Sequence, residues 1–328
     1  MKRLLPFTIG LLVVAVVVSA ACGVSAEDAA ISPEVNQALR LLMANDVFSK
    51  QAGLLKLEAL RDPSTMSAVR PFLDDSNPLL RAQALTAARA IQGKSAIPLL
   101  VDRLARDRHA DVRRQAANEL HELADPSTVP PLVSALEDRQ VVVRVAAVEA
   151  LGVMHDRSVT PAIIRQLRSR DAELRRSCAD ALGGLRDPQA REALIRRTRD
   201  RDVNVRRAAV KALHQLKDPA TVPAFIRTLR DRDDTVRKFA MKALGELVTN
   251  DTLPPLTKLI NAGRPTLRLY AIALLAHLGT PEALAVLQAR RARELNDVLR
   301  EQLDISIRYL EHPATASAAW PSAAKSTP

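Results

Sequence analysis

Aromatic residues, cysteine and glycine are scarce in this sequence. Phe, Trp and Tyr make up only 2% of the 328 residues while 47% are hydrophobic, so Leu, Ala and Val have to build the core. The two cysteines cannot form a disulfide framework, because Cys22 lies in an N-terminal apolar segment and leaves Cys178 alone. Only 10 glycines are present, and no stretch alternates apolar and polar residues between turn signals, so we expect a helical fold.

The sequence also lacks the motifs of common enzyme classes. It contains no G-x-S-x-G, no Walker loop, no H-E-x-x-H and no C-x-x-C. Cys178 has no evident base beside it, and the acidic pairs Asp74-Asp75 and Asp233-Asp234 fall in predicted turns. We therefore expect no enzyme activity, no catalytic or metal-binding residue and no cofactor.

The first 26 residues have the pattern of a secretory segment, in which a short positive start precedes an apolar run and small residues. Three interpretations stay open: cleavage after residues 24–26, lipidation of Cys22 after a lipoprotein box at 19–22, or an uncleaved membrane anchor over 4–24. Each of them predicts export, either to the periplasm or to a membrane-anchored position in a bacterial envelope.

The formal net charge of +11 favours anionic partners. Because export would separate the chain from nucleic acid, nucleic acid is not an expected partner. Acidic proteins, anionic lipid head groups and anionic envelope polymers remain as candidates.

A short pattern recurs at a nearly constant interval. Arginines recur with one spacing of 32 residues and then five of 31, at Arg81, Arg113, Arg144, Arg175, Arg206, Arg237 and Arg268. The third residue after each arginine is small and the seventh is apolar, as at Ala209 and Leu213. At 3.6 residues per turn these positions share one stripe with the apolar residue before the arginine, which predicts a helix with one buried face.

A second helix is predicted before each of these. Pairs such as Leu132-Val133 and Phe225-Ile226 are followed by a leucine one turn later, and prolines stand where such a helix would begin. Asp-Pro dipeptides mark the turn between repeats. One helix pair cannot bury both of its apolar stripes alone, so neighbouring pairs must stack.

The pattern resembles the HEAT-repeat family in its short, phycobilisome-lyase-like form. An aspartate six residues before the arginine carries the resemblance, in Asp75/Arg81, Asp107/Arg113, Asp138/Arg144, Asp200/Arg206 and Asp231/Arg237. The resemblance implies that these residues, with Arg175 and Arg268, form a polar ladder that links adjacent repeats. Ser169 and Ala262 replace the aspartate, so interruptions are expected before Arg175 and Arg268.

The expected fold class is all-α, a right-handed α-α superhelix of about nine helix pairs with a 31-residue period. We expect a signal or anchor segment at 1–26, a HEAT-like solenoid at 27–310, and a disordered low-complexity tail at 311–328. Related di-iron enzymes carry His-Glu pairs directly after the repeat arginine. None of the matching dipeptides here is His-Glu, so a di-iron site does not carry over.

Two surfaces are candidates for binding. By the resemblance the second helix of each repeat lines the concave side, where the candidate partner-binding residues are Arg114, Arg176, Arg207, Lys211, Lys238, Lys242, Phe239 and Tyr270. The first helix carries a basic column formed by Arg165, Arg168, Arg196, Arg199, Arg227, Arg230 and Lys258. That column is either a solvated face or a docking site for something acidic.

The expected function is that of an exported, non-catalytic scaffold or adaptor that binds a protein partner, with an acidic surface, through its concave face. One alternative is a HEAT-like enzyme or cofactor-maturation factor of the lyase or oxidoreductase kind. Another is an envelope protein that binds anionic lipid or polymer through the basic column, with membrane anchoring through the N-terminus.

Overall fold

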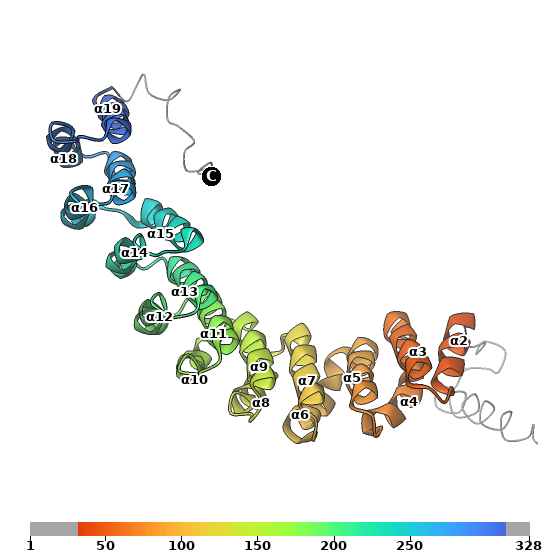
Figure 1. Ribbon diagram of the computed structural model, residues 1–328. Coiled ribbons are helices and arrows are strands. Elements are labelled where there is room, and N and C mark those ends of the chain that lie inside the picture. Colours follow the sequence, from red (N-terminus) through yellow and green to blue (C-terminus); the bar gives the residue numbers. More distant parts are fainter. Residues whose placement is uncertain (1–31, 313–328) are drawn as a thin grey trace, which may run out of the picture. The chain divides into compact units, whose positions relative to one another are not determined.

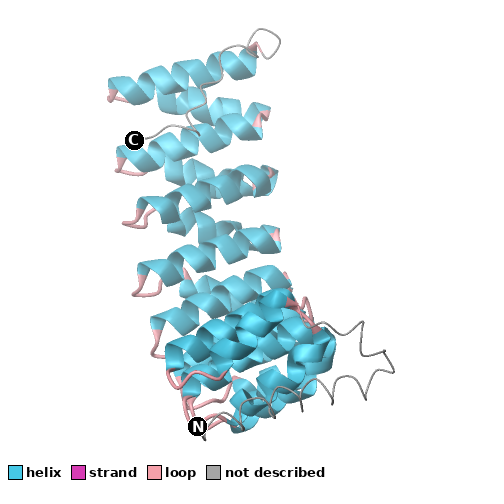
Figure 2. Cartoon of the chain, turned by 90° about the vertical axis from the view of Figure 1, so that its right-hand side faces the viewer, coloured by secondary structure: helices cyan, strands magenta, loops and turns pink. Residues whose placement is uncertain are grey.

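The computed structural model describes residues 32–312, and these residues contain α-helices, short 3-10 helices and loops but no strand (Figure 2). The predicted leader with Cys22 and the tail beyond residue 312 lie outside the described residues. Within the described range, none of the helices combines the length and apolar character needed to cross a bilayer. The all-α prediction is confirmed.

The chain divides into two compact units, and the boundary in the sequence falls between Met154 and His155. Unit 1 is described from residue 32 to residue 154 and contains four helix pairs. Its helices are α2 (Pro33–Leu42), α3 (Val47–Leu60), α4 (Met66–Val69), α5 (Pro78–Gln92), α6 (Ile97–Arg106), α7 (Ala110–Leu123), α8 (Val129–Ala135) and α9 (Val141–Val153).

Unit 2 is described from residue 155 to residue 312 and contains five helix pairs. In Figure 1, its first helices form one layer and its second helices form another. The pairs are α10 (Thr160–Gln166) with α11 (Ala172–Leu185), α12 (Arg191–Arg197) with α13 (Val203–Leu216), α14 (Val222–Thr228) with α15 (Asp234–Leu247), α16 (Leu253–Ile260) with α17 (Pro265–Leu278), and α18 (Pro281–Arg291) with α19 (Asp297–Glu311).

The helices begin where local chemistry favours a start. Ser32 caps α2 by accepting a hydrogen bond from the Val35 N–H, and Pro33 follows it. A one-turn 3-10 helix precedes several first helices, and its leading aspartate accepts an N–H two residues later, as Asp218 does from Ala220. The predicted Asp-Pro turns are therefore the capped starts of these 3-10 helices.

The core consists of the two apolar stripes of each pair, packed against the next pair. The residues at the seventh position after each repeat arginine are buried, whereas Ile307, seven residues after Arg300, is partly exposed. The small residues at the third position are also buried, including Cys178 at 0% exposure. Small side chains there let successive second helices approach closely, which the family pattern requires.

The second helices of most pairs end at a residue in the left-handed region. Positive φ angles lie at one equivalent position of the repeat at Arg61, Ala124, His155, Arg186, Lys217 and Gly279, and one residue later, after α5, at Gly93. Val248 stands at the same position after α15 but has φ −68°. A β-branched side chain is strongly disfavoured in the left-handed region, so α15 ends with a different backbone geometry.

Candidate binding surfaces

The ladder arginines connect one repeat to the next. In unit 2, Arg175 donates from Nε and Nη2 to both carboxylate oxygens of Asp200, at 2.8 and 2.7 Å. Its Nη1 donates to the Ser169 and Arg170 carbonyls at the start of its own second helix. One guanidinium thus satisfies loop carbonyls in its own repeat and holds the carboxylate of the following repeat.

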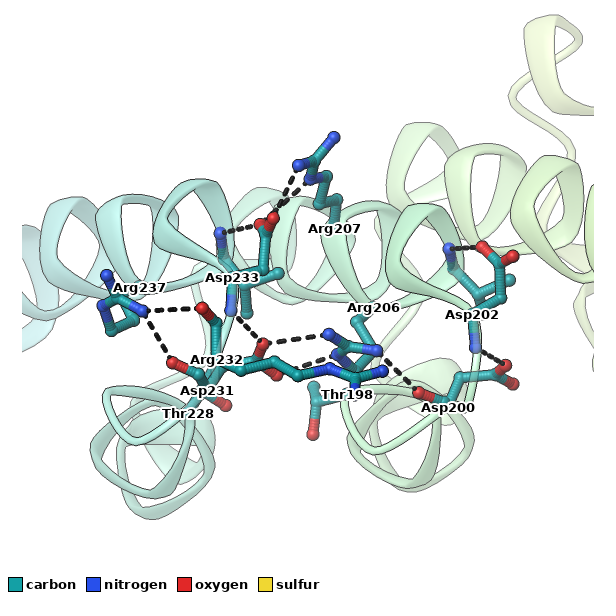
Figure 3. A network of polar contacts seen from close by, with 12 residues as sticks. Thr198, Asp200, Asp202, Arg206, Arg207, Thr228, Asp231, Arg232, Asp233 and Arg237 are labelled. Carbon is teal, nitrogen blue, oxygen red and sulfur yellow. Dashed lines mark hydrogen bonds and ion pairs between the residues drawn. The ribbon is translucent and has the colours of Figure 1, made fainter.

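The same arrangement recurs in both units. Arg206 binds Asp231 through two hydrogen bonds, as Figure 3 shows, and Arg268 binds Glu294 in the same way. In unit 1, Arg81 binds Asp107 and Arg113 binds Asp138. Each of these acids also accepts the backbone N–H two residues further on, so the carboxylate fixes the loop that enters its own second helix.

The structure corrects how the partners were paired. The aspartate six residues before an arginine offers that arginine only its backbone carbonyl, as Asp75 does to Arg81 at 2.9 Å. Its carboxylate faces the other way in the repeat, and in Asp107 it binds the arginine of the preceding repeat. Glu294 was not predicted, because only aspartate was expected at this position.

One rung of the ladder lacks a carboxylate in unit 2. Ala262 occupies the position that would face Arg237. Arg237 instead donates to the Asp231 and Arg232 carbonyls and to the neighbouring Asp234 carboxylate. In unit 1, Arg144 donates to the Asp138 carbonyl at 2.6 Å.

Two of the ladder carboxylates, Asp200 and Glu294, are strongly stabilised as anions. Burial alone would raise the pKa of Asp200, but hydrogen bonds from Arg175, the Asp202 N–H and Arg197 outweigh it and lower the pKa to about 2. For Glu294 burial again opposes ionisation, and hydrogen bonds from Arg290, the Asn296 N–H and Arg268 lower its pKa to about 2. These acids therefore stay charged across the physiological range.

The second-helix face of unit 2 carries a shallow pocket. It has a volume of about 200 Å³ and lies across α11, α13 and α15, with Arg176, Arg207, Lys211 and Phe239 in its lining. Arg207 donates two hydrogen bonds to Asp233, which lower the pKa of that carboxyl to about 2. The pocket thus brings together four of the predicted partner-binding residues.

The other predicted residues of this face lie outside the pocket. Arg114 pairs with Asp111 and Lys238 with Asp234, each within its own helix. Lys242 is exposed on α15, and Tyr270 is half-buried on α17.

Unit 1 contains a polar cluster that the sequence analysis did not identify. The Glu119 carboxylate on α7 is 3% exposed and accepts hydrogen bonds from Thr86 and Gln115, and it pairs with Arg89. Nearby, burial and the Glu119 charge raise the pKa of Glu58. These residues do not form a series of one residue type along the repeats, so periodicity gave no signal for them. The cluster satisfies its own members and leaves no evident place for a ligand.

All seven residues of the basic column are exposed. Arg165, Arg196, Arg227 and Lys258 lie on the first helices of unit 2, whereas Arg168, Arg199 and Arg230, which were predicted on the same helices, lie in the turns that follow them. A groove of about 430 Å³ opens on this surface, between the loops that follow α12 and α14. Asp200, Asp231 and two threonines line it together with six arginines. The arginines are Arg199, Arg201, Arg206, Arg227, Arg230 and Arg232. Figure 3 shows Arg206 and Arg232 between the two loops. The loop residues Arg201 and Arg232 were not among the predicted column residues.

A metal site is not supported by the side chains present. Within residues 32–312, no three His, Cys, Asp or Glu side chains come together in a way that could hold a metal ion. The surfaces described above are suited to binding charged groups, and their chemistry is that of guanidinium, ammonium and carboxylate.

Stacked helix pairs linked by a ladder of arginines and acids define a helical-repeat protein. The model of the family described as HEAT repeats matches residues 37–117, 97–167, 160–238 and 222–308, so the chain belongs to the HEAT-repeat family. No match to a curated protein was found.

Several solved structures are similar to this chain. The complex of CpcE and CpcF of phycocyanin lyase from Nostoc sp. PCC7120 is 21% identical, with a TM-score of 0.42, over 65% of this chain and 94% of that one. YibA of Escherichia coli is 18% identical, with a TM-score of 0.47, over 85% and 97%. Human deoxyhypusine hydroxylase in complex with glycerol is 24% identical, with a TM-score of 0.35, over 78% and 99%. At these identities and TM-scores, none of the similar structures assigns a function to this chain.

Proposed function

We propose that this protein is a non-catalytic HEAT-repeat scaffold that binds a protein partner through the second-helix face of unit 2. The pocket across α11, α13 and α15 is the observation that carries the proposal. It joins three successive repeats, so a partner seated there would contact several helices at once. Repeat arrays commonly bind partners over extended surfaces of this kind.

The chemistry of the pocket favours an acidic partner with an apolar contact. Lys211 is exposed on α13, and Phe239 on α15 offers one of the few aromatic rings of the chain. Arg176 and Arg207 are already paired with Asp180 and Asp233, so they line the pocket but add little net positive charge to it. We therefore assign the main attraction for a carboxylate to Lys211 and the apolar contact to Phe239.

A crosslinking capture from native cell extract tests the proposal. The full chain should capture a partner, and the variant Lys211→Glu with Phe239→Ala should lose it. Asn118→Glu is the matched control, because Asn118 on α7 has the same position in its repeat and lies outside the pocket. Capture that survives the pocket variant, or is lost equally in both variants, would show that this pocket does not bind the partner.

A catalytic alternative has its own readout. If the protein were a HEAT-like enzyme or a maturation factor, the purified chain should contain iron or an absorbing ligand. Metal analysis and an absorbance spectrum distinguish the two functions, and a stoichiometric metal or chromophore would contradict the scaffold proposal.

Export is part of the proposed function. It is supported by the charged and apolar pattern of the first 26 residues. Fractionation of cells that produce the full chain should place it in the envelope, and a cytoplasmic chain of full mass would contradict export.

A further inference from the structure

Three successive first helices of unit 2 end in the same arginine pattern. R-x-x-R-[SD]-R occurs at 165–170, 196–201 and 227–232, and all nine of its arginines are exposed. The pattern begins in the last turns of α10, α12 and α14 and continues into the loops that follow. Arginine side chains from successive layers therefore follow one another along one surface of unit 2.

The groove lies between the second and third of these segments. Arg199 and Arg201 contribute from one layer, and Arg227, Arg230 and Arg232 contribute from the next. With Arg206, six arginines face two aspartates, an excess of four positive charges around about 430 Å³.

The two aspartates in the groove are already engaged. Asp200 accepts two hydrogen bonds from Arg175 and one from Arg197, and Asp231 accepts two from Arg206. They therefore contribute little to neutralising the outer arginines. Among residues 32–312, Arg199, Arg227, Arg230 and Arg232 form no ion pair and donate no side-chain hydrogen bond, and Arg201 donates only to the Arg170 carbonyl.

The same pattern in unit 1 has a different environment. At 103–108 the sequence is also R-x-x-R-D-R. There Arg103 pairs with Asp74 at 2.7 Å, and Arg106 pairs with Asp102 at 3.1 Å. The pattern alone does not produce an uncompensated cluster, which requires the unit 2 surroundings.

We propose that this groove, the arginine groove, binds a soluble ligand that carries several phosphate groups, such as a short polyphosphate chain. Guanidinium groups match phosphate oxygens through paired hydrogen bonds, and a multivalent anion relieves the mutual repulsion of several arginines at once. The groove volume lies in the range of small-ligand sites, about 300–1,000 Å³. A recess between two loops accommodates a free phosphate chain better than the plane of lipid head groups. The site lies on the first-helix side and is independent of the proposed partner pocket.

Calorimetric titration of the full chain with tripolyphosphate tests the site, at about 0.15 M salt, where exposed charges are screened. We expect saturable binding, and weaker binding of orthophosphate and of the tricarboxylate citrate. The variant Arg199→Glu with Arg201→Glu should weaken the affinity for tripolyphosphate by at least about tenfold. Arg199→Lys with Arg201→Lys should give an intermediate affinity, because lysine keeps the charge but lacks the paired N–H donors of the guanidinium.

The matched control is Arg106→Glu with Arg108→Glu. These residues hold the same two positions of the pattern in unit 1, and the variant changes the net charge by the same amount. It should leave the affinity within about twofold, because Arg106 and Arg108 are exposed and do not line the groove. Every substituted side chain is exposed, so both variants should fold. Circular dichroism checks that they do.

Several outcomes would overturn the proposal. One is the absence of saturable tripolyphosphate binding, and another is an equal loss of affinity in the unit 1 and unit 2 variants, which would mean a general charge effect. A third is binding to vesicles of anionic phospholipid without binding to tripolyphosphate, which would identify a membrane-facing surface.

Discussion

At the residue scale, a ladder arginine such as Arg175 donates more hydrogen bonds than an arginine in a simple surface ion pair. The guanidinium of Arg175 is almost completely buried and donates to one carboxylate and two carbonyls. Removing either partner of such a pair leaves an uncompensated buried charge. The free-energy cost of that charge is much larger than the net stabilisation that the intact pair provides. The ladder therefore acts mainly by making misaligned stacking of repeats unfavourable.

Asp200→Asn should expose this cost and its dependence on pH. The pKa of Asp200 is about 2 in the folded chain against an ordinary 3.8, so its contribution is present above pH 3.8 and is lost as the pH falls toward 2. At pH 7 the variant should be less stable by about 3 kcal/mol, because Arg175 loses its counter-charge. The difference from the unsubstituted protein should shrink between pH 4 and 2.

Urea denaturation followed by circular dichroism at pH 7, 4 and 2.5 measures this difference. Asp102→Asn is a suitable control, because Asp102 forms an exposed pair with Arg106. A constant difference between Asp200→Asn and the unsubstituted protein over the whole pH series would contradict the argument.

The sequence predicted most members of the ladder, with the exception of Glu294, but not their partners. The periodic arginines and aspartates were visible because each recurs at a fixed position. The direction of the link was not visible, since Asp107 lies 6 residues from Arg113 and 26 from Arg81, and proximity in sequence favoured the wrong partner. Arg201 and Arg232 escaped notice because their role depends on two loops that only stacking brings together.

At the element scale, how closely helices approach differs between equivalent positions of the repeat. Gly183 on α11 and Gly245 on α15 both stand eight residues after the repeat arginine. A Cβ on Gly183 would overlap Gln215 and lie 2.9 Å from the Ala212 Cα on α13, whereas a Cβ on Gly245 would have nothing within 4 Å. The glycine is thus required for close packing on α11 but not on α15.

Alanine at the two glycines should have opposite effects. Gly183→Ala should destabilise the protein by about 1–3 kcal/mol, because α11 and α13 must move apart. Gly245→Ala should stabilise it by about 0.5–1 kcal/mol, because alanine favours a helix interior. Each variant serves as the other's control in chemical denaturation. A stabilising Gly183→Ala would show that α11 and α13 are not in close contact.

The helix ends offer a second test at this scale. Lys217 has φ 51°, a conformation that costs a side-chain-bearing residue roughly 1–2 kcal/mol. Lys217→Gly should therefore stabilise the protein by about 0.5–1 kcal/mol. Val248→Gly should give no gain, because its φ of −68° carries no such strain. Thermal unfolding compares them, and an equal effect of the two substitutions would rule out this explanation.

Element boundaries were only partly predictable. Ser32-Pro33 and the prolines of the first helices marked helix starts correctly, because capping and the missing proline N–H act locally. The 3-10 turns and the left-handed helix ends gave weak signals, since Ala124, His155 and Lys217 are not typical residues for positive φ. Stacking imposes these conformations, and residue preference does not reveal them.

At the scale of the whole molecule, each unit can be described as a series of layers whose stability depends on the links between neighbours. Within unit 2, the second helices α11 and α13 pack extensively against each other, while the contact between α15 and α17 is the smallest between neighbouring second helices. The same junction lacks a ladder carboxylate, because Ala262 faces Arg237. Packing and polar linkage are therefore weak at one place, which should be where unit 2 opens first.

Ala262→Asp should strengthen this junction. The new carboxylate would take the place that Asp231 occupies beside Arg206, and Arg237 would donate to it while keeping its bonds to the Asp231 and Arg232 carbonyls. The expected gain is about 1 kcal/mol, as for a hydrogen-bonded charge pair that is partly exposed. Hydrogen exchange should slow in α16 and α17, the layer that the new link attaches.

A double-mutant cycle with Arg237→Met decides whether the gain comes from this pair. In the Arg237→Met background, Ala262→Asp should give no stabilisation, because the carboxylate has no guanidinium to bind. If the aspartate stabilised both backgrounds equally, its effect would be that of a capping residue at the loop, and the missing rung would not be the reason that α15 and α17 pack weakly.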